Sequence, residues 1–226
     1  MITTDDVSWW SSFFAYLKFG WEEVLELAIE HAIVVIISIV IATVIGVGLG
    51  VATYRTERPR ELALAVTGTF LTIPSLALFG LFIAIPGLGL GARSVVVALV
   101  MYALLPIVRN TIVGLREVDP AVVESAQGMG MGRGKRLLRI ELPLAWPVVL
   151  TGMRVSTLIL IGITAIGAYI NGPGLGDLIF SGLAQIGSAT ALNLVLAGTL
   201  GVIVLAVLFD LLYVLIIRLT IPRGIR

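Results

Sequence analysis

Five long apolar stretches dominate this chain, and each is long enough to cross a membrane as a helix. The hydrocarbon core of a bilayer is roughly 30 Å thick, which takes about 20 residues of α-helix to span. Hydrophobic residues make up 58% of the 226 residues and charged ones only 13%, against about 25% charged in a soluble domain. We therefore predict an all-α polytopic membrane protein with five transmembrane helices. The stretches cover residues 28–53, 62–85, 94–115, 144–168 and 194–217.

The composition also excludes several classes of function. The chain has no cysteine and a single histidine, which argues against a disulfide, a thiol nucleophile or a zinc site. The glycine-rich residues 128–135 lack the spacing of a phosphate-binding loop. A net charge of +1 gives no reason to expect a nucleic-acid partner. We expect no enzyme activity, no catalytic residue, no metal and no cofactor.

The basic residues predict which side of the membrane each loop occupies. Cytoplasmic loops of membrane proteins collect Lys and Arg. The loops after the first and third stretches, and the tail 218–226, are rich in Arg, whereas the connection 171–193 has neither Lys nor Arg. We therefore expect the N-terminus outside and the C-terminus inside. The basic residues on the predicted inner side are Arg55, Arg58, Arg60, Arg116, Arg133, Lys135, Arg136, Arg139, Arg218, Arg223 and Arg226.

Residues 1–27 are predicted to form an extracytoplasmic interfacial arm ahead of the membrane domain 28–217. The segment is rich in Trp, Phe and Tyr, and Glu22, Glu26 and Glu30 follow at helical spacing. Aromatic rings favour the headgroup level, while the carboxylates would face water or partners. A simple anchor for the first span explains the same residues. His31 is interpreted as a satisfied interfacial side chain.

The loop 116–143, between the third and fourth stretches, is predicted to contain a short helix. Asp119 is a good helix N-cap, and Pro120 suits the first helical position because its missing N–H costs nothing there. Glycines at positions 128, 130, 132 and 134 are poor helix formers and should end the helix. We expect a compact helix along the cytoplasmic membrane surface.

This loop resembles that of the permeases of type I ATP-binding-cassette (ABC) importers. Their loop reads E-A-A, three residues, G, nine residues, I, one residue, L-P, and only Ser125 departs from it, small for small. The resemblance implies a bacterial inner-membrane permease, with a cytoplasmic ATPase that receives the loop helix. It also implies an extracytoplasmic substrate-binding protein and a second permease subunit, identical or paralogous. Anionic lipid is an alternative partner for the basic run 133–139. The expected ATPase-coupling residues are Glu124, Ser125, Ala126, Gly130, Ile140, Leu142 and Pro143.

Segments between residues 72 and 183 resemble the glycine betaine, carnitine and choline osmoprotectant permeases more narrowly. The segments are Thr72–Phe79, Tyr102–Thr111, Glu117–Pro120 and Gly174–Phe180. The resemblance implies import of a quaternary amine, with methionine importer permeases as the nearest alternative.

Three aromatic side chains are candidates to line a pathway for such a substrate. A quaternary ammonium has no N–H to donate, so proteins hold it against aromatic faces. Phe79, Tyr102 and Tyr169 lie in or beside the predicted spans. Ordinary packing in the core or at the interface is the favoured explanation for aromatic residues at these positions.

Prolines and charges inside the spans are the remaining candidate features. Pro74 and Pro106 remove backbone hydrogen bonds and should kink their helices. A lone charge in the bilayer is costly, so we expect Asp210 to pair with Arg154 or Arg109 and to act near a gate. A secondary transporter is the alternative from another class, but it would ordinarily place carboxylates in mid-membrane for ion coupling and would leave the loop helix unexplained.

Overall fold

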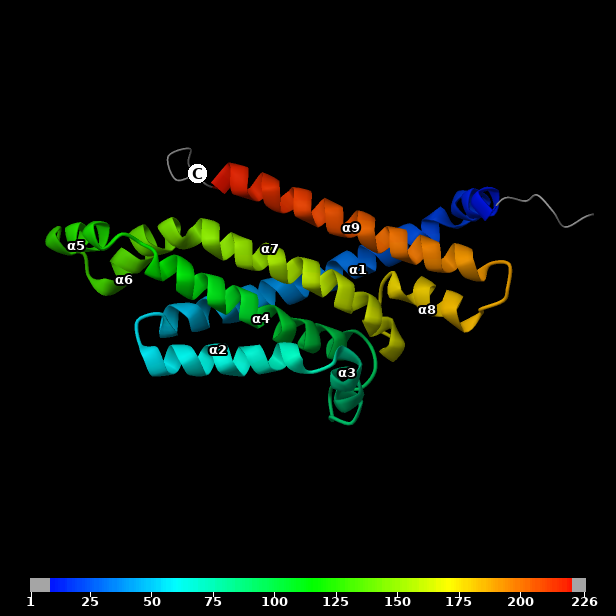
Figure 1. The fold of residues 1–226 in the computed structure, drawn as a ribbon, viewed down its shortest axis with the longest axis horizontal. Helices are drawn as coiled ribbons and strands as arrows, with labels where there is room; N and C mark the ends of the chain where they lie inside the picture. The colour runs from blue at the N-terminus through cyan, green and yellow to red at the C-terminus, as the bar shows by residue number, and fades with distance from the viewer. Residues whose placement is uncertain (1–8, 221–226) are drawn as a thin grey trace, which may run out of the picture. The chain divides into compact units, whose positions relative to one another are not determined.

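The computed structural model describes residues 9–220, which form helices joined by loops without any strand (Figure 1). The eight residues before this range and the end of the predicted tail, with Arg223 and Arg226, lie outside the described part. The elements are α1 (Trp9–Thr53), α2 (Glu57–Thr72), α3 (Ser75–Ile83), α4 (Ala92–Arg116), α5 (Pro120–Gly128), α6 (Arg133–Arg136), the π-turn η1 (Leu137–Glu141), α7 (Leu142–Gly167), the 3-10 turn η2 (Ala168–Ile170), α8 (Gly176–Ala184) and α9 (Ala191–Thr220).

The helices account for the five predicted apolar stretches. Between residues 9 and 220, four helical segments are long and apolar enough to cross a membrane, and the bent pair α2–α3 makes a fifth if it is counted as one span. The stretches 94–115, 144–168 and 194–217 coincide with α4, α7 and α9. Composition located these helices because each needs a continuous apolar surface against lipid.

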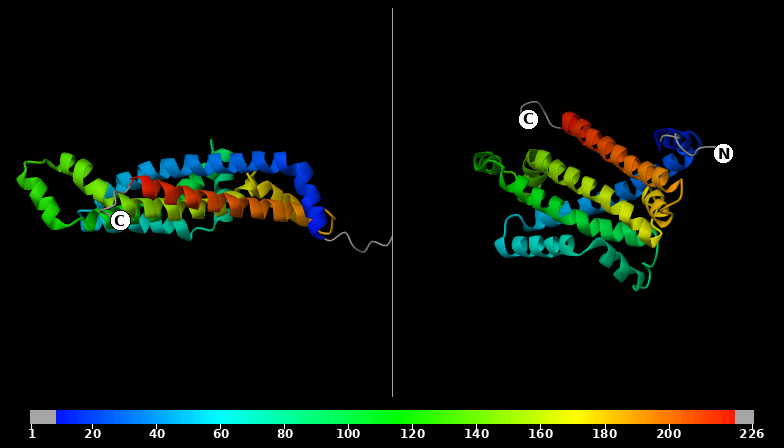
Figure 2. Two further views of the ribbon diagram at one scale, coloured as in Figure 1. Left: turned by 90° about the horizontal axis from the view of Figure 1, so that it is seen from above. Right: turned by 45° about the vertical axis from the view of Figure 1, so that its right-hand side comes forward.

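Helix α1 joins the predicted arm and the first predicted span without a break. It has 45 residues, roughly 68 Å of helix, more than twice the thickness of a bilayer core. Residues 21–28 are mostly Glu, Leu and Ala, which are strong helix formers, so no cap or turn separates the two parts. Its first turns nevertheless run in a different direction from the remainder (Figure 2).

The second predicted span is broken at Pro74. Helix α2 ends at Thr72, and Ile73 is extended with ψ 125°, because the ring of a following proline disfavours the helical conformation. Helix α3 restarts at Ser75 and makes an angle of 91° with α2. The Tyr102 hydroxyl donates a 2.7 Å hydrogen bond to the Ile73 carbonyl. The break therefore has a protein donor where lipid would offer none.

The chain divides into two compact units, and several helices contribute residues to both. The first unit comprises Met1–Ile36, Ser75–Val96 and Ile161–Val207. Glycines permit its closest contacts: a Cβ at Gly198 would lie 2.7 Å from Ile179, and one at Gly176 would lie 1.9 Å from the Ala165 carbonyl oxygen. Helix α8, which lies in the connection 171–193, was not predicted because nine residues are too few to read as a span.

His31 is fully buried in the first unit. Its Nε2 lies 3.1 Å from the Ile161 carbonyl oxygen. A Cβ on the neighbouring Gly174, whose φ is +119°, would lie 2.9 Å from the His31 Cβ. The interpretation as an interfacial side chain therefore placed it too close to water, because one polar atom in the apolar stretch does not reveal which neighbours cover it.

The second unit comprises Ile37–Pro74, Val97–Leu160 and Leu208–Arg226. Its helices approach closely at small residues. A Cβ at Gly50 of α1 would lie 2.6 Å from Thr111 of α4, and a Cβ at Gly152 of α7 would lie 2.7 Å from the Pro106 carbonyl oxygen. Such contacts stabilise helix pairs in membranes, where apolar burial alone gives little preference for protein over lipid.

We expect Tyr102→Phe to lower the stability of the protein by about 1–3 kcal/mol, because it leaves the Ile73 carbonyl without its donor. Thermal unfolding in detergent measures the change. Tyr169→Phe is the matched control, because that side chain is 67% exposed. Equal unfolding temperatures for the two variants would show that the hydrogen bond at the break contributes nothing.

Candidate functional site

Helix α5 begins as the sequence predicts. The Asp119 side chain accepts a 2.8 Å hydrogen bond from the Ala121 N–H, and Pro120 occupies the first helical position. The cap satisfies one of the backbone donors that every helix N-terminus leaves free. Within the second unit, α5 lies beyond the ends of α4 and α7, in the views of both Figure 1 and Figure 2. The loop therefore presents a short, well-capped helix.

Gly130 ends this helix through its backbone conformation. Its φ is +78°, in the left-handed region that favours glycine. Two hydrogen bonds close the turn: the Gly130 N–H donates to the Gln127 carbonyl at 2.9 Å, and the Met131 N–H donates to the Ala126 carbonyl at 3.1 Å. This pair of bonds is the Schellman motif. A Cβ at Gly130 would meet no atom within 4 Å, so within this chain the position requires a backbone conformation rather than space.

The predicted coupling residues divide between an exposed and an inner face. Glu124, Ser125 and Gly130 are exposed, whereas Ala126 is buried. The Ser125 hydroxyl donates to the Ala121 carbonyl within the helix at 2.7 Å. The exposed face is therefore made of small or polar side chains, with Met129 69% exposed at its end.

The remaining predicted residues lie where the loop enters α7. Ile140 belongs to the π-turn η1, and Leu142 and Pro143 begin α7. Ile140 and Leu142 are half-buried and Pro143 is exposed. Leu142 packs against a buried apolar cluster, formed by Tyr54, Val108, Ile112, Leu115 and Ala145.

A buried carboxylate, that of Glu141, lies between Ile140 and Leu142. Its side chain is 3% exposed. The Arg136 Nε donates to Glu141 Oε1 at 2.7 Å, and the Arg136 side chain is itself 6% exposed. The π-turn, an irregularity frequent at functional sites, holds these two residues five positions apart.

Two further donors reach Glu141 from the end of α1. The Tyr54 hydroxyl donates to Oε2 at 2.6 Å, and an Arg55 terminal nitrogen donates to Oε1 at 2.9 Å. The Tyr54 hydroxyl in turn accepts from the Arg55 Nε. We call Tyr54, Arg55, Arg136 and Glu141 the Glu141 cluster. It joins the loop to a helix end 86 residues away in sequence.

The electrostatics of the cluster explain why all four side chains are needed. A buried carboxylate is tolerated only when it is paired and hydrogen-bonded. Burial and the hydrogen bond to Glu141 together raise the pKa of the Tyr54 hydroxyl above its ordinary value, so Tyr54 stays protonated and continues to donate. The Arg55 guanidinium lies 4.9 Å from the centre of the Tyr54 ring, which adds a cation–π contact.

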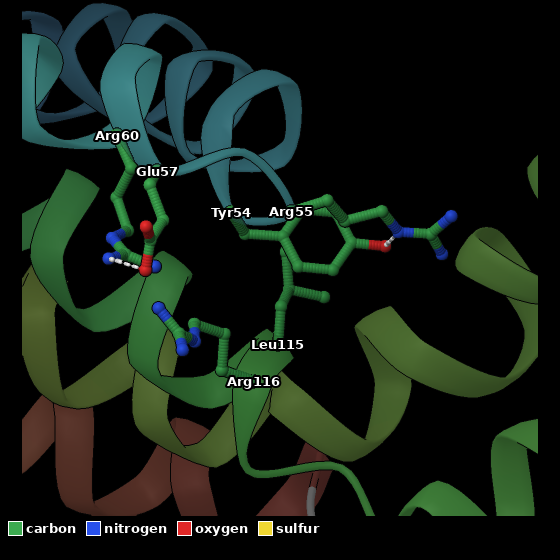
Figure 3. A pocket seen from close by; sticks show the side chains of 6 residues that line it. All are labelled: Tyr54, Arg55, Glu57, Arg60, Leu115 and Arg116. Carbon is green, nitrogen blue, oxygen red and sulfur yellow. Dashed lines mark hydrogen bonds and ion pairs between the residues drawn. The ribbon is translucent and has the colours of Figure 1, made fainter.

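A cavity of about 350 Å³ opens beside this cluster (Figure 3). It is lined by Tyr54, Arg55, Glu57, Arg60, Leu115 and Arg116. In the close view, Arg60 and Arg116 extend toward the Glu57 carboxylate, while Arg55 extends away from it. The cavity therefore shares Tyr54 and Arg55 with the Glu141 cluster, while Arg60 and Arg116 lie on the side of Glu57.

Of the predicted intramembrane charges, two form an ion pair. The Arg154 Nε donates to Asp210 Oδ1 at 2.6 Å, and a terminal nitrogen donates to Oδ2 at 2.7 Å. The pair joins α7 to α9, and both side chains are about one third exposed, 36% and 33%. Arg109 is exposed on α4 and is not the partner of Asp210.

The three aromatic pathway candidates differ in their burial. Phe79 is fully buried in the first unit, and Tyr102 is 3% exposed with its hydroxyl bonded to Ile73 in the second. Tyr169 is 67% exposed, with its ring 6.0 Å from that of Phe180. Tyr169 therefore offers an accessible aromatic face, whereas Phe79 and Tyr102 are buried within this chain.

Comparison with known families identifies the class of protein. The family model described as binding-protein-dependent transport system inner membrane component matches residues 42–221. The chain belongs to this family. Its match includes the whole loop 116–143 and the Glu141 cluster.

Three relatives within this permease family are similar over most of their length. The choline transport system permease protein OpuBB of Bacillus subtilis is 34% identical over 93% of this chain and 94% of its own. The osmoprotectant import permease protein OsmW of Salmonella typhimurium is 39% identical over 88% of this chain and 93% of its own. The glycine betaine/carnitine/choline permease protein OpuCD of B. subtilis is 40% identical over 72% and 69%.

A solved structure shares the fold of this inner membrane component. A chain of the MetNI methionine ABC transporter, in an inward-facing conformation, matches with a TM-score of 0.76. It covers 88% of this chain and 96% of the other at 24% identity. At that identity the likeness concerns the fold alone.

Sequence reasoning missed the Glu141 cluster in this permease. Glu141 was counted only as the end of the basic run, although a single carboxylate following four basic residues is itself a signal for an ion pair. Arg55 was interpreted only as an orientation signal, and Arg136 as an orientation signal or as part of a basic run facing lipid. Nothing local marked Tyr54, because its partner lies 87 positions away.

We expect Glu141→Gln to destabilise the permease by about 3 kcal/mol, because it leaves the buried Arg136 and the adjoining Arg55 without a counter-charge. Thermal unfolding of the purified protein measures this. Glu124→Gln is the control, since an exposed side chain typically changes stability by less than about 0.5 kcal/mol. Similar unfolding of both variants would contradict a structural role for Glu141.

Proposed function

We propose that this chain is the membrane-spanning permease subunit of an ABC importer for a quaternary-amine osmoprotectant, of the class of choline, carnitine or glycine betaine. The observation that carries the substrate class is the likeness to named choline and osmoprotectant permeases over nearly the full chain. It is supported by the loop motif, whose residues form a capped helix with an exposed face. ATP hydrolysis belongs to separate ATPase subunits, and a binding protein delivers the substrate from outside.

In this proposal α5 is the contact with the ATPase. Its exposed face carries Glu124, Ser125 and the adaptable Met129, and methionine suits a surface that must repack. The Schellman turn at Gly130 fixes where the helix stops and the chain turns back. The Glu141 cluster then connects the movement of α5 to the end of α1, because Glu141 cannot separate from its partners without exposing unpaired buried charge.

The proposed orientation places α5 and the ends of α1, α2 and α4 on the cytoplasmic side. Arginine is abundant in the loops at this end, in accord with the positive-inside rule. Two permease subunits are proposed to enclose the pathway, because the five transmembrane helices of one chain are too few to surround a gated translocation pathway. In the pathway Tyr169 is the proposed aromatic contact, and the Arg154–Asp210 pair holds α7 and α9 together near the inner gate.

The structure disfavours the alternative of a secondary transporter. The described carboxylate within α9, Asp210, is engaged by both nitrogens of Arg154, which leaves it poorly placed to take up and release a coupling ion. The alternative of methionine import is supported only by a fold shared at lower identity. A shared fold alone does not establish which substrate is transported.

Uptake in reconstituted vesicles tests the substrate class. The permease, its ATPase, its partner permease and its binding protein are combined, and accumulation of radiolabelled choline, carnitine, glycine betaine and methionine is measured. We expect ATP-dependent accumulation of at least one quaternary amine and none of methionine. Methionine uptake would move the chain to the other substrate class, and ATP-independent uptake would refute the ABC assignment.

A glycine pair tests the role of α5. Gly130→Ala forces an L side chain into a left-handed conformation, at a cost of about 1–2 kcal/mol, whereas Gly134→Ala fills open space in a helix. We expect ATPase stimulation by loaded binding protein and uptake to fall at least about fivefold in the first variant. Equal amounts of both variants should insert in the membrane. Normal coupling in Gly130→Ala would remove this role from the turn after α5.

A further inference from the structure

Three arginines gather at one end of the second unit without enough protein partners. Arg60 of α2 and Arg109 and Arg116 of α4 line an opening of about 450 Å³, together with Leu64, Ile112, Val113 and Glu117. Arg60 and Arg116 also line the adjoining 350 Å³ cavity. The two openings therefore share Arg60 and Arg116.

The charge of Arg60 is poorly compensated within the described residues. Its side chain is only 17% exposed, and its one ion pair is a 3.8 Å contact with Glu57, which is 82% exposed. Arg109 and Arg116 form no ion pair within residues 9–220. Bringing like charges together costs free energy that an anion between them would recover. In Figure 3, Arg60 and Arg116 extend toward the same carboxylate, so the arrangement already suits one anionic group.

The apolar lining indicates which anion would enter. Ile112 is buried, Leu64 is half-buried and Val113 is 39% exposed, so apolar side chains continue from the arginines along the same opening. A free phosphate would leave this surface uncovered, whereas a lipid would place its headgroup on the arginines and an acyl chain along α2 and α4. Arginine suits a phosphate because its planar fork matches two phosphate oxygens.

We propose that Arg60, Arg109 and Arg116 bind the phosphate of an anionic phospholipid from the inner leaflet. The proposal rests on the proposed orientation, which puts this end at the cytoplasmic surface. Basic pockets between helix ends on that side are suited to anionic headgroups. Glu57 is the internal anion that such a lipid displaces, and the exposed Glu117 stays in water.

Lipid retention by the purified importer, with its partner subunits present, tests the site. The complex is placed in nanodiscs of mixed phosphatidylglycerol and phosphatidylcholine, and the tightly bound lipid is identified by mass spectrometry. We expect phosphatidylglycerol to be retained, and each of Arg60→Gln and Arg116→Gln to weaken retention roughly fivefold, the ratio typical of one basic residue at an anionic surface. Arg58→Gln is the matched control, because Arg58 is exposed in the same helix and lines neither opening. Glu57→Gln should strengthen retention.

Several results would overturn the proposal. Equal weakening by Arg58→Gln would indicate only a diffuse basic surface. Equal retention of phosphatidylcholine would show that the arginines do not select the net negative charge of the headgroup, which would overturn an anionic lipid as the ligand. Release of the lipid by inorganic phosphate at constant ionic strength would assign the site to a free anion, and absence of retained phosphatidylglycerol from the complete importer would refute the site. Nanodiscs present the same lipid in both leaflets. Retention is measured by mass spectrometry rather than by transport, so the result does not depend on uptake. Quaternary-amine transport without retained lipid refutes this site alone, and retained lipid without transport refutes the proposed substrate alone.

Discussion

The structure of the loop depends on one buried carboxylate. Glu141, 3% exposed, is paired with two guanidinium groups and accepts a hydrogen bond from a phenol. Loss of either arginine or of the carboxylate would leave a charge without its partner, and loss of the phenol would leave the carboxylate without a donor. The donors come from two parts of the sequence, Arg136 in the loop itself and Tyr54 with Arg55 at the end of α1. These ion pairs and hydrogen bonds therefore hold the loop against the end of α1. The short helix α5 depends on such contacts, since helices of this length are marginal alone.

The same demand for satisfied polar groups shapes the membrane-embedded helices. A proline break at Pro74 exposes a carbonyl, and Tyr102 supplies its donor. A charge at Asp210 is matched by both nitrogens of Arg154. In an apolar solvent each unsatisfied group costs several kcal/mol, so these contacts decide which helices stay together. Close approach of the helices at Gly50 and Gly152 completes the packing. The loop 116–143 and the break at Pro74 are held by specific hydrogen bonds, so a movement there would act through those contacts.

Composition and periodicity predicted the spans because lipid imposes one rule on every residue that faces it. The N-cap Asp119 and the glycine that ends α5 were predictable for a similar reason, since caps act over a few residues. Helix α8, the burial of His31 and the Glu141 cluster were not predictable, because each depends on which distant side chains meet. Tyr102 illustrates the difference: its position in a span was evident, but the partner of its hydroxyl was not, because the Ile73 carbonyl lies 29 positions away.

Glu141 and Arg55 are expected to act as one unit that ties the loop to α1. A double-mutant cycle of Arg55→Gln and Glu141→Gln tests this coupling, with both the unfolding free energy and the ATPase stimulation by loaded binding protein measured for each of the four proteins. We expect the double variant to lose little more than Glu141→Gln alone, with an interaction energy of about 1 kcal/mol or more. Losses that simply add, in stability and in stimulation alike, would contradict it.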